Sequence, residues 1–101
     1  MAVAAGYRVL EGQARAALAA ARLVEAGYAD AAALARQAAA ILGVAGYRFS
    51  QVEALITLGH AVSALDGVEA GAACWREALK VASGIEGTAE NDVRRLLATS
   101  R

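Results

Sequence analysis

Apolar residues recur along most of this chain at intervals of three and four positions, which is the spacing of one face of an α-helix. The pattern is clearest after Ser50, which stands three positions before Glu53 in the order of a capping box. Proline is absent, so no strong helix breaker interrupts the apolar runs. The pattern predicts five helices, at about residues 8–26, 29–43, 50–66, 68–83 and 88–99.

Glycines mark the expected ends of these helices. Asp66-Gly67 ends the third helix, because glycine tolerates the left-handed conformation that a helix C-terminus requires. Gly27 occupies the corresponding place in the first turn. The remaining expected boundaries are Gly84 and Gly87 at the end of the fourth helix, and Thr88 with Glu90 at the start of the fifth. Since the connections are short, neighbouring helices should run antiparallel.

A unit of two helices is duplicated in the sequence. Residues 5–8 are Ala-Gly-Tyr-Arg, and the same four residues occur 40 positions later, at 45–48. Further matches at this offset, without a gap, include Leu18 with Leu58, Gly27 with Gly67, Arg36 with Arg76, and Ala38 with Ala78. We therefore expect one repeat-containing domain over 1–101, with repeats at about 6–45 and 46–85 and a partial third repeat or cap at 86–101. The pattern is compatible with a fragment of a longer array.

Small and large residues alternate in the second unit at a characteristic spacing. A Leu-Gly pair, bulky residues, a turn, a small residue, an aromatic and an alanine stand at Leu58, Gly59, Val62, Leu65, Gly67, Gly71, Trp75 and Ala78. This spacing resembles that of the tetratricopeptide repeat (TPR) family. Its small residues allow two helix backbones to approach, and the aromatic side chain fills the space between them. The first unit follows more loosely, with Leu18, Gly27, Ala31 and Ala38 in place and Ala35 at the position of Trp75.

The resemblance implies an all-α fold, a solenoid of antiparallel helix pairs with about five helices. The 40-residue unit is longer than the common repeat of about 34 residues. It is similar to the long variants in kinesin light chains and in the C-terminal arrays of bacterial ATP-binding transcription regulators, including LuxR-type antibiotic-pathway activators. The bias towards Ala, Gly, Arg and Val favours a bacterial source with a high GC content. HEAT-type repeats share the period and are the second interpretation.

In repeats of this kind the first helix of each pair lines a concave face that holds a peptide or helix. The resemblance places the binding face of the first unit at Gln13, Ala16, Ala17, Ala20, Leu23 and Val24. It places that of the second unit at Glu53, Ile56, Thr57, His60, Ser63 and Ala64. These residues are mostly small or apolar and almost none is basic, so the expected partner is a protein or an amphipathic helical peptide. The alternative is that the alanines serve only the tight packing of helices.

Composition and charge exclude several classes of function. Ten basic and ten acidic residues balance, and no run of like charges provides a nucleic-acid or acidic-membrane surface. No apolar stretch near the start approaches the ~20 residues needed to span a bilayer. Cys74 is the only cysteine, so no internal disulfide forms, and a reducing, cytoplasmic location is expected. Neither a phosphate-binding loop nor a metal-ligand spacing is present, and we expect no cofactor and no metal.

The leading hypothesis is a non-enzymatic module for protein–protein interaction, as the sensory or assembly tail of a bacterial transcription regulator. A second hypothesis is a structural homo-oligomerisation unit that joins through apolar ends of the solenoid. The ends in question are Val3, Val9 and Leu10 on one side, and Val93, Leu96 and Leu97 on the other. The weakest hypothesis is an enzymatic or small-molecule-binding bundle that uses Glu53, His60 and Cys74, although Cys74 and Trp75 are more simply explained as packing residues.

Overall fold

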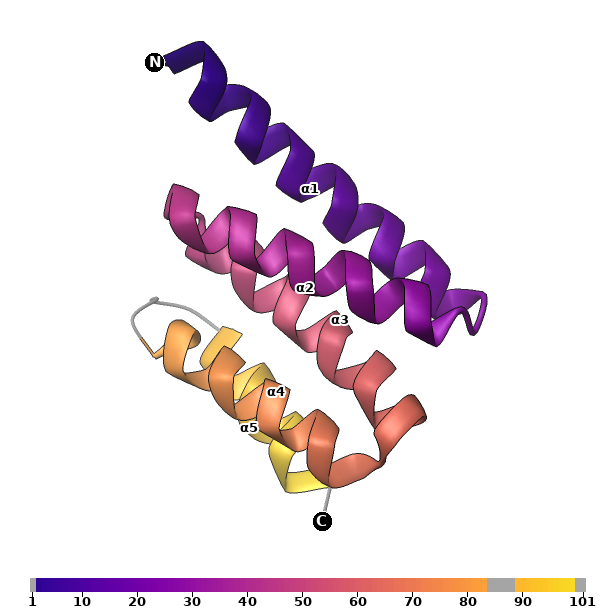
Figure 1. Cartoon of the computed structure of the whole chain (residues 1–101). Coiled ribbons are helices and arrows are strands. Elements are labelled where there is room, and N and C mark those ends of the chain that lie inside the picture. Colours follow the sequence, from indigo (N-terminus) through magenta and orange to yellow (C-terminus); the bar gives the residue numbers. More distant parts are fainter. Residues whose placement is uncertain (1, 84–88, 100–101) are drawn as a thin grey trace.

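The computed structural model describes residues 2–83 and 89–99, and every element in this part of the chain is an α-helix (Figure 1). The all-α expectation is confirmed. The helices are α1 (Ala2–Val24), α2 (Tyr28–Ala45), α3 (Arg48–Asp66), α4 (Val68–Ala82) and α5 (Ala89–Thr99). The expected boundaries at Gly84, Gly87 and Thr88 lie outside the described residues.

Each helix packs antiparallel against the next, and α1 and α5 lie on opposite sides of the stack (Figure 1). Besides its sequence neighbours, α3 also contacts α1 and α5. Within the described residues α2 and α4 do not contact each other. The odd-numbered helices therefore form one layer and the even-numbered helices a second, which agrees with a slab whose Cα extents are 45 × 31 × 16 Å.

The third helix begins earlier than expected. It starts at Arg48 with Tyr47 as its N-cap residue, and no side chain caps it. Ser50 and Glu53 therefore lie inside the helix, and the expected capping box is wrong. The cause is the preceding turn, in which Gly46 is left-handed and the Tyr47 amide donates to the Leu42 carbonyl at 2.9 Å. This Schellman turn leads the chain directly into α3.

The turn between α1 and α2 has the same hydrogen bonds but a different residue in the left-handed position. The Gly27 amide donates to the Arg22 carbonyl at 2.8 Å, and the Ala26 amide donates to the Leu23 carbonyl at 3.1 Å. Ala26 has φ = 61°, whereas Gly27 has φ = −81°. The expectation that Gly27 supplies the special backbone conformation is thus wrong, because the chain turns one residue earlier. A Cβ in this region costs about 1–2 kcal/mol.

The turn between α3 and α4 does depend on its glycine. Gly67 has φ = 102° and ψ = 164°, a backbone region that residues with a Cβ atom rarely adopt. This conformation differs from the left-handed helical one that the sequence suggested, because a single residue separates the two helices and must reverse the chain alone.

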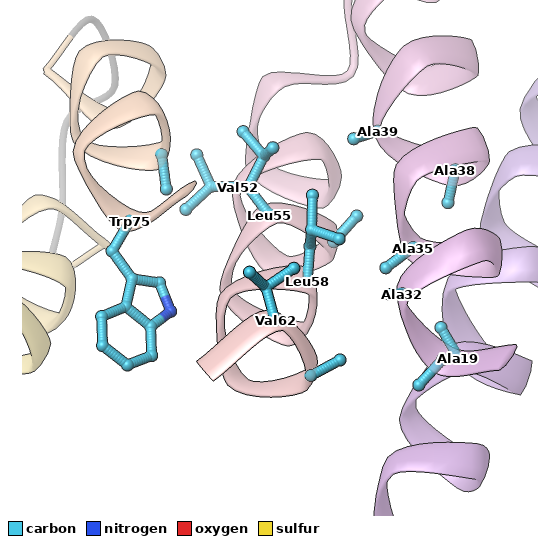
Figure 2. Close-up of a cluster of buried hydrophobic side chains, with 14 of the residues drawn as sticks. Ala19, Ala32, Ala35, Ala38, Ala39, Val52, Leu55, Leu58, Val62 and Trp75 are labelled. Carbon is cyan, nitrogen blue, oxygen red and sulfur yellow. The ribbon is translucent and has the colours of Figure 1, made fainter. Parts of the chain in front are cut away.

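The core is built largely from alanine on α2 and from branched residues on α3. Figure 2 shows Leu55 and Leu58 of α3 beside the alanines of α2, with Trp75 of α4 on the other side of α3. The buried positions of α2 recur in α4 after 40 residues: Ala31, Ala32, Ala35 and Ala38 match Gly71, Ala72, Trp75 and Ala78. Ala35 and Trp75 are both buried, so the two pairs share a pattern but differ in the volume that fills it.

The helices α3 and α4 approach most closely at two glycines. A Cβ on Gly71 would lie 2.6 Å from the Gly59 carbonyl oxygen and would overlap the Ser63 side chain. A Cβ on Gly59 would overlap the indole ring of Trp75. The indole Nε1 donates to the Ile56 carbonyl at 3.2 Å, which fixes the ring at this junction. The small residues and the aromatic thus act together, as the sequence spacing implied.

One expected packing position and one expected apolar end differ from the prediction. Leu18 is 44% exposed, whereas its counterpart Leu58 is buried. The reason is that α2 precedes and covers α3, while no described helix precedes α1. At the other end Val93 is fully buried, and Leu96 and Leu97 are partly buried against the core, so the apolar residues expected to be exposed there are at least partly covered.

We expect Gly71→Ala to lower the free energy of unfolding by about 1–3 kcal/mol, because the Gly59 backbone as well as the Ser63 side chain opposes the added methyl group. The matched control is Gly6→Ala in α1, where a Cβ meets nothing within 4 Å. There the higher helix propensity of alanine should raise the free energy of unfolding by up to about 1 kcal/mol. Urea denaturation followed by circular dichroism measures both. Equal effects of the two substitutions would contradict the close approach.

Ala26→Gly should raise the free energy of unfolding by about 0.5–1 kcal/mol, since relief of the left-handed strain exceeds the added entropy of the unfolded chain. Ala21→Gly, at an exposed position inside α1, should instead lower it by about 1 kcal/mol. Denaturation midpoints compared at constant slope provide the measurement. A loss of stability with Ala26→Gly would show that this turn is not strained.

Candidate functional site

A groove of about 400 Å³ lies between α1 and α3. We call it the α1–α3 groove. Its walls are Gln13, Ala16, Ala17 and Ala20 from α1, and Ser50, Glu53, Ala54 and Thr57 from α3. Because the α1 wall carries three alanines, the backbone of α1 is open to a ligand along about two turns. The groove is therefore suited to contact along its length rather than to enclosure of a small molecule.

The structure brings together part of the expected binding face. Gln13, Ala16, Ala17, Ala20, Glu53 and Thr57 line the α1–α3 groove. The other members lie elsewhere. Leu23 and Ile56 pack against the core, Ser63 lies against α4, Val24 and Ala64 are exposed outside the groove, and His60 packs on Trp75.

Two lining residues were missed by the sequence analysis. Ser50 was assigned to a cap outside the helix, although the earlier start of α3 turns it towards α1. Ala54 is almost fully buried and contributes to the floor of the groove. Periodicity does carry the signal for Ser50, because it stands three positions before Glu53 on the same helical face.

The groove has a mild electrostatic character. Glu53 is the one ionisable residue in its lining, and Gln13, Ser50 and Thr57 supply the neutral polar groups. The Thr57 hydroxyl donates to the Glu53 carbonyl at 3.2 Å, so its proton is already engaged. None of the described residues that line the groove is basic, which disfavours an acidic peptide or a terminal carboxylate as ligand.

The α3 residues beyond the groove form the junction with α4. His60 meets Trp75 edge to face, with ring centroids 5.2 Å apart and an angle of 70° between planes. This packing removes part of the imidazole from water, and the desolvation lowers the pKa of His60. No hydrogen bond joins His60 to Glu53 in the described residues, since the two side chains serve different surfaces.

The polar atom of Ser63 is unusual at this junction. Its Oγ is buried beside Gly71 and has no hydrogen-bond partner in the part of the chain that the structure describes. A buried hydroxyl without a partner costs about 1–3 kcal/mol. It marks the place where α3 and α4 meet rather than a site open to a ligand.

Among the described residues no hydrogen bond joins Glu53, His60 and Cys74, the residues of the enzymatic hypothesis, to one another. Cys74 is half-buried, and burial raises the pKa of its thiol, so the reactive thiolate is scarce at neutral pH. Among the described residues no three His, Cys, Asp or Glu side chains gather closely enough to hold a metal ion.

Comparison with protein-family models, with curated proteins and with solved structures finds no match to this chain. Among the described residues, no helix combines the length and the apolar character that a membrane span requires.

Lowering the pH from about 7.5 to about 5.5 should destabilise the protein through His60. Its folded pKa lies below the ordinary value, so the neutral ring is favoured in the fold. The stability is fully present above about pH 6.5 and is lost as the unfolded state takes up a proton. Urea midpoints across this range measure the effect, and His60→Gln should flatten it. Parallel pH profiles for the two proteins would exclude His60 as the cause.

Proposed function

We propose that this chain is a non-enzymatic helical-repeat module of the tetratricopeptide type, and that it binds another protein through the α1–α3 groove. The observation that supports this most directly is the duplicated helix pair. The offset of 40 residues that relates the sequences of the two units also relates the buried positions of α2 and α4. Repeats that stack in this way form continuous concave surfaces, which such proteins use for binding.

The groove chemistry favours an amphipathic helix as partner. The alanines let a bulky apolar side chain of the partner approach the α1 backbone, as in other helix-in-groove complexes. Glu53 at the same surface favours a basic residue on the polar face of that helix. The absence of basic lining residues makes an acidic ligand unfavourable.

The biological setting follows from the sequence resemblance alone. A module of this kind fits the sensory or assembly tail of a bacterial, cytoplasmic transcription regulator. In that role it binds protein, whereas DNA contact belongs to other parts of such a regulator. The balanced charge of the chain agrees with this division, because it provides no basic surface for phosphates.

The test is selection of amphipathic helical peptides from a displayed library, with the purified chain as bait. Selected peptides should lose at least ~10-fold in affinity when Ala17→Arg fills the groove. Ala33→Arg is the matched control, since Ala33 is an exposed alanine on α2 outside the groove, and it should change affinity less than ~2-fold. Titration calorimetry gives the values.

Two results would overturn the proposal. One is a selection that yields no helical binder. The other is a set of binders that tolerate Ala17→Arg as well as they tolerate Ala33→Arg, because such peptides would occupy a surface other than the α1–α3 groove.

A further inference from the structure

One face of α1 carries an apolar row that no described part of the chain covers. Its members are Tyr7, Leu10, Ala14, Leu18 and Ala21, spaced three and four apart, and we call them the α1 stripe. All five are exposed, with Tyr7 at 70%, Leu10 at 62% and Leu18 at 44%. Large apolar side chains gathered in a row on a surface helix usually mark an interface.

The internal duplication shows what this face does when it is covered. The residues 40 positions after Ala14, Leu18 and Ala21 are Ala54, Leu58 and Ala61 of α3. All three are buried, with Leu58 lying on the side of α3 that faces α2 (Figure 2). The same helical face is therefore buried by a neighbouring helix in one unit and left bare in the other.

The positions of the α1 stripe are symmetric about Ala14, which suits a second, antiparallel copy of α1 as the partner. Leu10 and Leu18 stand four positions on either side of Ala14, and Tyr7 and Ala21 stand seven positions on either side. If a second α1 lies antiparallel across it, Ala14 meets Ala14, and Leu10 meets Leu18 of the second copy. Tyr7 then meets Ala21, so the largest residue lies against a small one. A central alanine lets the two backbones approach closely.

Charges at the border of the α1 stripe also suit a second copy. Glu11 accepts hydrogen bonds from Arg8 at 2.7 Å and from Arg15 at 2.9 Å, all on one helix. A two-fold axis through Ala14 keeps this border on the same side in both copies. It places Glu11 about 3 Å along the helix axis from Arg15 of the second copy. Glu11 of each copy thus meets Arg15 of the other, and the two Glu11 carboxylates are about 9 Å apart along the axis. The two Arg15 residues are about 3 Å apart along the axis, and each is hydrogen-bonded to Glu11 and Gln37 of its own chain.

We infer that this chain forms a two-fold dimer in which two α1 helices pack antiparallel through the α1 stripe. The stripe spans about 21 Å of helix, so the interface is at the small end of specific contacts and the dissociation constant should be micromolar or weaker. None of the five residues of the α1 stripe lines the α1–α3 groove, so each surface has its own residues and its own test. The inferred dimer is thus independent of the proposed peptide binding.

Sedimentation equilibrium from about 1 µM to about 1 mM tests the association at the concentrations that a weak dimer requires. The native chain should show a monomer–dimer equilibrium. Leu18→Glu should weaken it at least ~10-fold, because it places a carboxylate against an apolar residue of the second copy. Leu65→Glu is the matched control, since Leu65 is a similarly exposed leucine, 48% exposed, on α3, and it should change the constant less than ~2-fold.

Cysteine cross-linking tests the register. In a Cys74→Ala background, Ala14→Cys should form a disulfide-linked dimer under mild oxidation, because the two-fold axis brings residue 14 of both copies within bridging distance. Leu10→Cys mixed with Leu18→Cys should give the mixed dimer, while Leu10→Cys alone should give little. Ala33→Cys on α2 is the control that should form no disulfide-linked dimer.

Three results would overturn the inference. They are a chain that remains monomeric up to the highest concentration, an association that Leu18→Glu and Leu65→Glu weaken equally, and efficient cross-linking of Leu10→Cys with itself. The last would indicate parallel helices. In each of these cases the native groove can still bind a peptide, and Ala17→Arg can still abolish that binding. Failure of the dimer is therefore distinguishable from failure of peptide binding at the α1–α3 groove.

Discussion

The close approach of α3 and α4 is the constraint on which the rest of the structure depends. Gly59 and Gly71 remove the side chains that would separate the two backbones, and Trp75 fills the space beside them. This contact fixes which face of α3 points towards α4. Because the positions around a helix are fixed relative to one another, the contact also determines which side of α3 faces α2 and which side faces α1 across the groove. A single narrow contact therefore orients three surfaces of the central helix.

The two helix pairs have similar arrangements but are packed with different residues. The second pair has one large aromatic at its junction, whereas the first has Ala35 at the equivalent place and relies on close contact between small residues. An ion-paired network adds to the first pair, in which Arg15 bonds both Glu11 of its own helix and Gln37 of α2. Such exposed polar contacts contribute little to stability. We therefore regard the first pair as the weaker half of the fold, held in place by its contact with α3.

The sequence was informative where short-range periodicity decides the outcome. The helical spacing and the glycines predicted five helices, and the resemblance to the tetratricopeptide spacing predicted that Gly59, Gly71 and Trp75 share one junction. The same resemblance implied that Gln13, Ala16 and Glu53 lie on one surface. It could not show that Leu18 would lie bare while Leu58 is buried, because that depends on which helix covers which face. Nor could it reveal Ala26 in a left-handed turn or His60 against Trp75, since both follow from the tertiary path of the chain.

The chain contains a single tryptophan, and its position means that tryptophan fluorescence reports on one half of the molecule. Its indole lies between α3 and α4, is hydrogen-bonded to a carbonyl of α3, and has an imidazole at its edge. Emission from this ring therefore reports the state of the second helix pair, while α1 and α2 contribute helical ellipticity without any comparable fluorescence. The natural sequence thus already carries a reporter that can separate the loosening of one half of the molecule from the loosening of the other.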